Sequence, residues 1–305
     1  MLYPTHQRFG ILWGLVALPI GVFLGLIPIL SFDMSSTEMI MVIICGFIGM
    51  RGSLFGAEFP DIDSPSSIPR KKHPLIGSIF DACGVKHRGI YSHDFVSIGL
   101  TFGTIYLIVN FAGDRWINSI MQGNTFMGTL AYIGILAFVW IIGNSIVELI
   151  LWIANLIKNK KMWATVNSKR IIINTLFSLP VVVLMSFMGI FDLSNVFGNI
   201  DMSQAVMSAM IIVTSLKIFT VFSLVGAYSH LFADMLTKSG VSIFFKRISP
   251  MGIVSKFRKL PLGKIIVPLE PRTGGRWENL VRYIVTGLCI PASIIAVMVM
   301  TGKVM

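Results

Sequence analysis

The sequence has few charged residues and no paired cysteines. Only 13% of its 305 residues are Asp, Glu, Lys or Arg, and its mean hydropathy is +0.80. This composition is far too apolar for a soluble domain and excludes that class. No CxxC pair occurs, so neither a disulfide framework nor a cysteine zinc site is indicated. The three scattered cysteines are Cys45, Cys83 and Cys289.

The apolar residues are gathered into runs of about 20, the length that a bilayer-spanning helix needs. Transmembrane β-strands would be shorter and would alternate in polarity. The runs and their charged connectors therefore predict an all-α, polytopic integral membrane protein with about seven transmembrane helices. No low-complexity tract or internal repeat divides the chain, so we expect a single membrane-embedded domain over residues 1–305. The predicted spans cover roughly residues 10–30, 40–55, 95–111, 126–157, 171–190, 205–235 and 280–300.

The net charge of +11 is explained by membrane topology and does not call for a nucleic-acid partner. All lysines and arginines except Arg115, Lys217 and Lys303 fall in or near the connectors of one side. The positive-inside rule makes that side cytoplasmic. We therefore expect a multi-pass protein of the bacterial inner (plasma) membrane with its N-terminus in the cytoplasm. The connectors of this side are residues 1–9, 57–94, 158–170 and 236–279.

Four short polar segments open onto the predicted cytoplasmic side, and they are rich in the residue types that bind metal ions. They contain four of the five histidines, and only His73 lies elsewhere. The clustering suggests one shared site at the cytoplasmic interface. The segments are "THQRFG" (5–10), "EFPDIDSPSS" (58–67), "KHRGIYSHDF" (86–95) and "SHLFAD" (229–234).

Within these segments the spacing of histidines and aspartates suits a shared cation. Asp61 and Asp63 are two residues apart, so both carboxylates could face one ion from one side of an extended segment. Taken alone, such a turn is more often loop punctuation. His230 and Asp234 share one face of a helix at the end of a span, where an ionisable group usually has a task. They could instead pair only with each other.

Together the segments supply imidazole nitrogens and carboxylate oxygens, a mixture that suits Zn²⁺, with Mn²⁺ or Fe²⁺ as alternatives. The candidates exceed what one tetrahedral zinc ion accepts, so we expect two or more divalent ions. Such ions lower the pKa of bound water and clamp the oxygens in a displacement at phosphorus. The candidate ligands are His6, Asp61, Asp63, His87, His93, His230 and Asp234.

Three further polar residues are candidates for catalytic roles. Arg88, next to His87, is placed to hold a phosphate with two hydrogen bonds or to steady a carboxylate. Glu58 and Asp94 are candidates for orienting ligand histidines or for accepting a proton. For Asp94, a solvated carboxylate near a helix N-terminus is an equal alternative.

The connector 237–279 mixes basic and apolar residues, a composition that can lie on an anionic leaflet. An ordinary positive-inside loop explains this composition as well. Within the connector, residues 273–275 predict a tight turn whose backbone N–H groups point at an anion. Trp277 is expected to be an interfacial anchor.

These motifs resemble the YdjM-type family of inner-membrane proteins, which are described as LexA-binding, metal-dependent hydrolases. The segments "DMLTKSGVSIFF" and "TGGRWE" (273–278) also resemble later elements of that family. This chain departs from the family pattern at Ser64, where a histidine is usual, and in the spacing of His87 and His93, which is one residue longer. The matching elements, in chain order, are Thr5-His6, the PDID turn at 60–63, His87-Arg88-Gly89 with His93, and Ser229-His230 with Asp234.

The resemblance implies a membrane-bound, metal-dependent hydrolase. A more distant similarity to zinc-dependent phospholipases C implies a phosphoester substrate, so membrane lipids and a phosphorylated lipid are the expected partners. A second hypothesis is a non-catalytic, metal-stabilised membrane scaffold that binds a cytoplasmic regulatory protein. A transporter would place its charges near the midplane, whereas only Glu148 and Lys217 fall deep in predicted spans.

Overall fold

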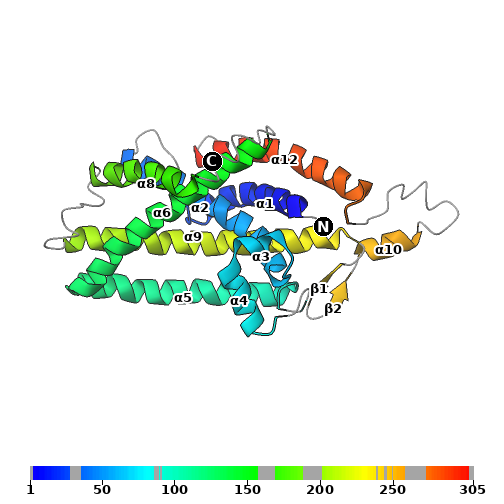
Figure 1. Cartoon of the computed structure of the whole chain (residues 1–305), viewed down its shortest axis with the longest axis horizontal. Helices are drawn as coiled ribbons and strands as arrows, with labels where there is room; N and C mark the ends of the chain where they lie inside the picture. The colour runs from blue at the N-terminus through cyan, green and yellow to red at the C-terminus, as the bar shows by residue number, and fades with distance from the viewer. Residues whose placement is uncertain are drawn as a thin grey trace. The chain divides into compact units, whose positions relative to one another are not determined.

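The computed structural model of the chain is built almost wholly from helices (Figure 1). The predicted all-α class is confirmed, and a single short hairpin departs from it among the described residues. In this hairpin β1 (Val241–Ile243) pairs antiparallel with β2 (Lys246–Ile248). The structure describes residues 3–27, 36–85, 89, 91–156, 169–187, 201–237, 240–243, 246–248, 250–257 and 273–301.

Among the described residues, seven helices are long and four are short. The long helices are α1 (Tyr3–Phe23), α2 (Ser36–Glu58), α5 (Phe95–Met121), α6 (Thr125–Leu156), α8 (Arg170–Phe187), α9 (Met202–Met235) and α12 (Arg276–Met300). The short ones are the 3-10 helix η1 (Phe59–Asp63), α3 (Ile68–Lys72), α4 (Pro74–Ala82) and α10 (Pro250–Phe257).

Five of the described helical segments are long and apolar enough to cross a membrane. They match five of the seven predicted spans, and several extend beyond the predicted bounds. The other two predicted spans correspond to α1 and α8. The first two turns of α1 carry polar side chains, and the apolar part of α8 is short, Ile172–Val183. The count of seven therefore stays a prediction. The five segments are Val42–Asp63, Phe95–Met121, Thr125–Ser145, Met202–Met235 and Arg276–Met300.

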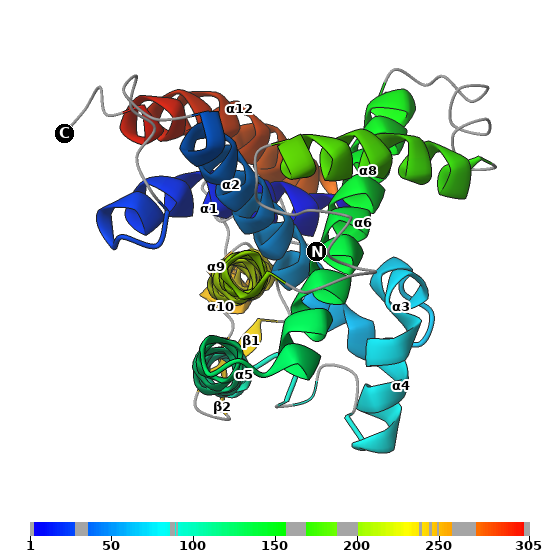
Figure 2. The ribbon, with the colours of Figure 1, turned by 90° about the vertical axis from the view of Figure 1, so that its left-hand side faces the viewer.

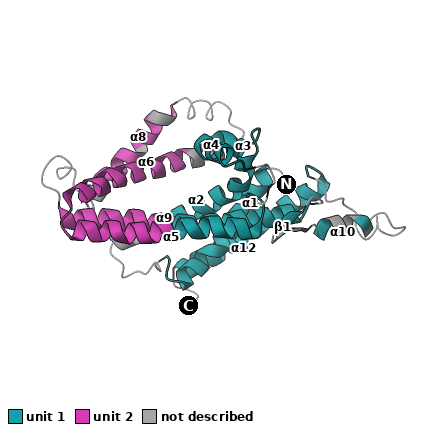
Figure 3. Cartoon of the chain, turned by 90° about the horizontal axis from the view of Figure 1, so that it is seen from below, with its two compact units in different colours: residues 1–106, 218–305 teal, residues 107–217 magenta. Residues whose placement is uncertain are grey.

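The chain forms two compact units (Figure 3). Unit 1 comprises residues 1–106 and 218–305, and unit 2 comprises residues 107–217. In unit 2, α6 and α8 pack through a glycine and an amide. The Asn174 side chain donates to the Trp140 carbonyl over 3.4 Å. Gly143 leaves room for α8, since a Cβ there would lie 2.4 Å from Asn174 Oδ1.

Within unit 1, glycines bring α2 against α9. A Cβ on Gly56 would lie 1.9 Å from the carbonyl oxygen of Ser223, and one on Gly226 would lie 1.9 Å from that of Ser53. Small residues permit this approach of two backbones, which larger side chains would prevent. The last two turns of α2 therefore lie directly on α9.

Helix α1 packs on α2 and on α12 (Figure 2). It runs antiparallel to α2, since Gly10 lies next to Ala57 and Gly14 lies next to Met50. The Ser53 hydroxyl donates to the Gly10 carbonyl over 2.7 Å. Phe9 of α1 is buried with Val281 of α12 and with Ala233 near the end of α9. These contacts bring the start of α1 beside the end of α9 and the start of α12.

Candidate metal centre

Three histidine rings meet in unit 1 where the start of α1 lies beside the end of α9. His6 comes from the first turn of α1 and His230 from the last turns of α9, and their rings stack with centroids 3.6 Å apart and planes 7° apart. His93, just before α5, meets the His230 ring edge-on with a centroid distance of 5.5 Å. All three residues are buried, with at most 5% of their surface exposed.

Two aspartates lie among these rings. Asp234 approaches the Nε2 atoms of His6 and His230 at 3.4 and 3.7 Å. Asp61 approaches the Nε2 atoms of His230 and His93 at 3.8 and 4.0 Å. Two atoms that bind one zinc ion at a tetrahedral angle lie about 3.4 Å apart, whereas a direct N–H···O hydrogen bond is about 2.9 Å long. The spacing is closer to that of ligands around a cation than to that of a hydrogen-bonded cluster.

The five side chains form two overlapping groups that could hold an ion. One group is His6, His230 and Asp234, and the other is Asp61, His93 and His230, with the ligand atoms of each group within 4.8 Å of one another. The first group is buried throughout. In the second group, 23% of the Asp61 side chain is exposed. The cluster therefore has a closed side and a more open side.

The backbone of α2 determines which nitrogen of His230 faces the cluster. His230 Nδ1 lies 2.7 Å from the Ala57 carbonyl oxygen, which can only accept, so Nδ1 carries the proton. The lone pair of Nε2 then points at Asp61 and Asp234. This Nε2 atom is buried and has no hydrogen-bond partner among the described residues. Gly56 makes the arrangement possible, because it allows α2 to approach α9 at the residue before Ala57.

A serine and an aspartate hold His93 in a similar way. His93 Nδ1 lies 3.0 Å from Ser92 Oγ, and the Ser92 hydroxyl donates to Asp63. Asp63 Oδ2 itself lies 3.4 Å from His93 Nδ1. A proton on Nδ1 satisfies this chain of contacts and directs Nε2 towards Asp61. Such outer partners commonly set the orientation of a metal-binding histidine.

Asp61 and Asp63 do not face the same side, and the expectation of an extended segment is wrong. Residues 59–63 form a 3-10 helix that begins directly after α2, with a proline in its first turn. Its residues repeat every three positions, so side chains two apart diverge. Asp61 consequently faces the Nε2 atoms of two histidines, while Asp63 faces Ser92 and the far nitrogen of His93.

The segment before α12 fixes the start of α1 beside His6. The Thr5 hydroxyl donates to Glu278 Oε1 over 2.6 Å, and the Gly274 N–H donates to Glu278 Oε2 over 2.6 Å. Gly274 has φ +77°, so the turn predicted for residues 273–275 is present. The carboxylate of Glu278 is an anion towards which this turn directs an N–H group. Trp277 Nε1 donates to the Leu236 carbonyl, which ties α12 to the end of α9.

Burial keeps His6 in the neutral form that binds metals. It lowers the pKa of His6 well below the ordinary 6.5, and the neighbouring His230 lowers it further, while Asp234 opposes the shift. A metal ion binds the deprotonated nitrogen of imidazole, so competition from protons is weak here at neutral pH.

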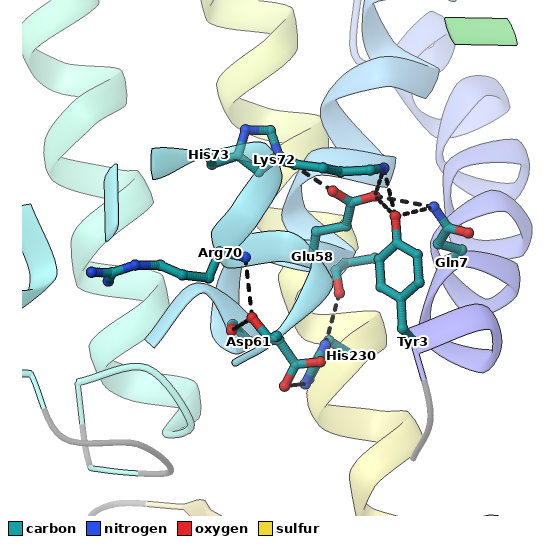
Figure 4. Close-up of polar contacts among 10 residues, drawn as sticks. Tyr3, Gln7, Glu58, Asp61, Arg70, Lys72, His73 and His230 are labelled. Carbon is teal, nitrogen blue, oxygen red and sulfur yellow. Dashed lines mark hydrogen bonds and ion pairs between the residues drawn. The ribbon is translucent and has the colours of Figure 1, made fainter. Parts of the chain in front are cut away.

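Glu58 belongs to a separate network next to this cluster (Figure 4). Its Oε1 accepts from the Tyr3 hydroxyl at 2.7 Å and from Gln7 Nε2 and Lys72 Nζ at 3.1 Å. Its Oε2 lies 3.2 Å from His73 Nε2. The histidine that Glu58 contacts is thus the one outside the predicted site. The network joins the start of α1, the end of α2 and the end of α3.

The remaining predicted residues fall in two places. Asp94 is buried and caps α5, since its Oδ1 accepts from the N–H groups of Val96 and Ser97 at 2.9 and 3.2 Å. The alternative of a solvated carboxylate is therefore wrong, because Asp94 is buried. Its predicted place at a helix N-terminus is confirmed. His87 and Arg88 lie outside the described residues, and their predicted roles stay predictions.

Four groups that support the cluster were not identified from the sequence: the Ala57 carbonyl and the side chains of Thr5, Ser92 and Glu278. A backbone carbonyl has no signature in a sequence. Thr5, Ser92 and Glu278 each lie within or beside a segment already singled out, but polarity alone does not indicate which partner a side chain meets.

Comparisons with models of protein families, with curated proteins and with solved structures found no match.

Proposed function

We propose that this protein is a membrane-bound, metal-dependent hydrolase that acts on a phosphoester. The main support is the buried Nε2 of His230, directed at two carboxylates and left without a hydrogen-bond partner among the described residues. Burying such a group among carboxylates is costly unless a cation joins them. The order of its motifs, which resembles the YdjM-type family, supports the same proposal.

We infer that His6, His230 and Asp234 would hold one divalent ion, and Zn²⁺ is the ion that we favour. Two imidazoles and a carboxylate are a common catalytic zinc set, in which a fourth position stays open. The partly exposed Asp61 marks the side on which that position would lie. Because His230 offers one nitrogen, the two overlapping groups do not make two complete sites. Binding of two or more ions would therefore require metal ligands in addition to the two groups described here.

An ion bound there would supply Lewis acidity, lowering the pKa of water and stabilising charge at phosphorus. The protein would contribute orientation and proton transfer. Ser92 and Asp63 orient the His93 ring. Asp61, the most exposed carboxylate of the cluster, is placed to accept a proton from a water molecule on the open side. Among the described residues, Asp61 makes ion-pair contacts with the Nε2 atoms of His93 and His230.

The substrate class follows from where the cluster lies. Asp61 lies near the end of the candidate span Val42–Asp63, and His230 and Asp234 lie near the end of the span Met202–Met235. A site at span ends is close to the depth of lipid headgroups. A lipid or lipid-linked phosphate is therefore the substrate that we favour.

The test is metal analysis of purified wild type, His230→Ala and His73→Ala, together with turnover of phosphodiesters and phospholipids. We expect wild type and His73→Ala to hold metal and to hydrolyse a phosphoester, and His230→Ala to lose both. His73 is a matched control, since it is a histidine of the same unit that contacts Glu58 outside the cluster. Wild-type protein without metal after incubation with Zn²⁺, Mn²⁺ and Fe²⁺ would refute the proposal.

A second candidate is a metal-stabilised scaffold without catalytic activity. It is favoured by the burial of His6, His93 and His230, because structural zinc sites are closed to solvent. This candidate predicts bound metal and a large fall in melting temperature on metal removal, but no turnover of any phosphoester tested.

A further inference from the structure

The two short helices after η1, α3 and α4, are tied to each other by polar contacts, and we call them the α3–α4 hairpin. Ser67 caps α3, accepting from the Arg70 N–H over 3.1 Å. The Arg70 guanidinium then donates to the Gly77 carbonyl and pairs with Asp81, which links α3 to both halves of α4. The hairpin is therefore held in one conformation by its own polar contacts.

One face of the hairpin packs on the core of unit 1. Ile76 and Phe80 of α4 pack against the cluster that contains Phe59 and Ile62 of η1. The Phe59 and Phe80 rings meet edge-on with centroids 5.3 Å apart. The hairpin is thus fastened to the turn that carries Asp61.

The adjoining face of α4 is apolar and exposed. Leu75 is 75% exposed and Ile79 is 52% exposed, and their separation of four residues puts them on one side of α4. Ile68, at the start of α3, is also 52% exposed. Leu75 and Ile79 thus form an exposed apolar strip along α4, and such a surface commonly marks a site of interaction with another apolar environment.

The preceding helix, α3, ends in two lysines. Lys71 is exposed, and 42% of the Lys72 side chain is exposed although its ammonium contacts Glu58. Apolar side chains next to lysines on a short helix are typical of segments that lie in the headgroup region of an anionic leaflet.

We propose that the α3–α4 hairpin is an interfacial anchor, with Ile68, Leu75 and Ile79 inserted into an anionic leaflet and Lys71 on its headgroups. The candidate span Val42–Asp63 ends five residues before Ile68, which keeps the hairpin near the bilayer surface. This continuity and the lysines favour lipid over a second copy of the chain. The inference depends on membrane insertion and not on metal binding, so it stands or falls apart from the proposed activity.

Cys83, exposed just after α4, offers a position for a reporter. The Cys289→Ala protein, in which the remaining Cys45 is buried, would be labelled at Cys83 with an environment-sensitive fluorophore. It would be placed in nanodiscs with or without anionic lipid, each containing lipid with a nitroxide near the headgroup. We expect strong quenching that increases with anionic lipid.

Two variants and a control test the surface itself. The Leu75→Asp/Ile79→Asp variant should lose the quenching, while Leu75→Val/Ile79→Leu, which keeps the apolar face, should retain it. Lys71→Ala should weaken insertion of the hairpin into anionic discs about fivefold, which is measured as reduced quenching of the fluorophore at Cys83. Quenching that is absent in every disc, or unchanged by the aspartates, would overturn the proposal. If the fluorophore is protected from quenching only at high protein concentration, the apolar face instead binds a second copy of the chain.

Discussion

Each histidine of the cluster is held by a different kind of support. His230 Nδ1 is bound by the Ala57 carbonyl, and His93 Nδ1 lies against Ser92, which donates to Asp63. His6 is fixed through its neighbour Thr5, which donates to a buried glutamate. These supports direct ring nitrogens into one small volume. A residue that orients a metal-binding side chain should therefore be distinguishable by experiment from a residue that binds the metal itself.

We expect Asp63→Asn and Asp234→Asn to have different effects, although both side chains are buried. Asp63→Asn should leave one equivalent of metal bound and lower phosphoester turnover about 10- to 100-fold, because Asp63 acts through Ser92 and His93, neither of which is among the three proposed ligands. Asp234→Asn should abolish stoichiometric binding, because it removes a charged ligand. The measurement is Co²⁺ titration with absorption spectra. An altered Co²⁺ spectrum in Asp63→Asn would instead make Asp63 a ligand, as the sequence-based hypothesis had it.

At the scale of elements, the contact between α2 and α9 positions His230 and Asp61 of the cluster. Gly56 and Gly226 let the two backbones approach, and this approach brings Ala57 to His230. The 3-10 helix η1 then follows without a linker and turns Asp61 into the cluster. The PDID turn is useful to the site only because the helix before it lies so close to α9.

The corresponding prediction is that Gly56→Ala is strongly destabilising and abolishes metal binding. Its Cβ would lie 1.9 Å from the Ser223 carbonyl oxygen, so α2 and α9 must separate. Gly103→Ala is the matched control, since it lies within α5 with no heavy atom within 4 Å of the added Cβ. This control should be neutral or stabilising by up to about 1 kcal/mol. Thermal unfolding and metal content measure both effects. Equal behaviour of the two variants would contradict the close-packing argument.

At the scale of the whole molecule, the number of membrane crossings is the open structural question. Helix α1 runs antiparallel to α2 through the contacts of Gly10 and Gly14 with Ser53, and its start meets the end of α2 at the cluster. If α2 crosses the bilayer, α1 must pass through the same depth. The start of α1 and the residues directly after η1 then lie on one side of the membrane.

Reporter fusions test this topology. We expect green fluorescent protein to fluoresce when fused after residue 85 or 168, and alkaline phosphatase to be active when fused after residue 33 or 198. This pattern corresponds to seven crossings with a cytoplasmic cluster, in keeping with the distribution of lysine and arginine. Phosphatase activity after both residue 33 and residue 85 would show that α2 does not cross.

Much of the fold follows from local sequence. The long apolar runs predicted five of the described candidate spans, and the composition predicted a helical membrane protein. The four polar segments also supply the five side chains that the structure brings together, because histidine and aspartate are rare in an apolar protein and their positions are therefore informative. Bounds were less accurate, since α5 continues beyond its predicted end at residue 111 and α12 begins before its predicted start at residue 280.

The partners of individual side chains did not follow from the sequence. Glu58 was expected near the ligand histidines, yet it binds Tyr3, Gln7, Lys72 and His73. Its direction depends on how α1 and α3 meet the end of α2, which is a matter of tertiary packing.

The sequence alone determined the helical, apolar class of the protein and the segments that supply the histidine and aspartate cluster, because hydrophobicity and residue type are local properties. Only the tertiary structure decided that Asp61 faces the histidines while Asp63 supports one of them from behind. The physical reason is that these roles depend on the direction of side chains on a 3-10 turn, and on glycine contacts between helices far apart in the chain.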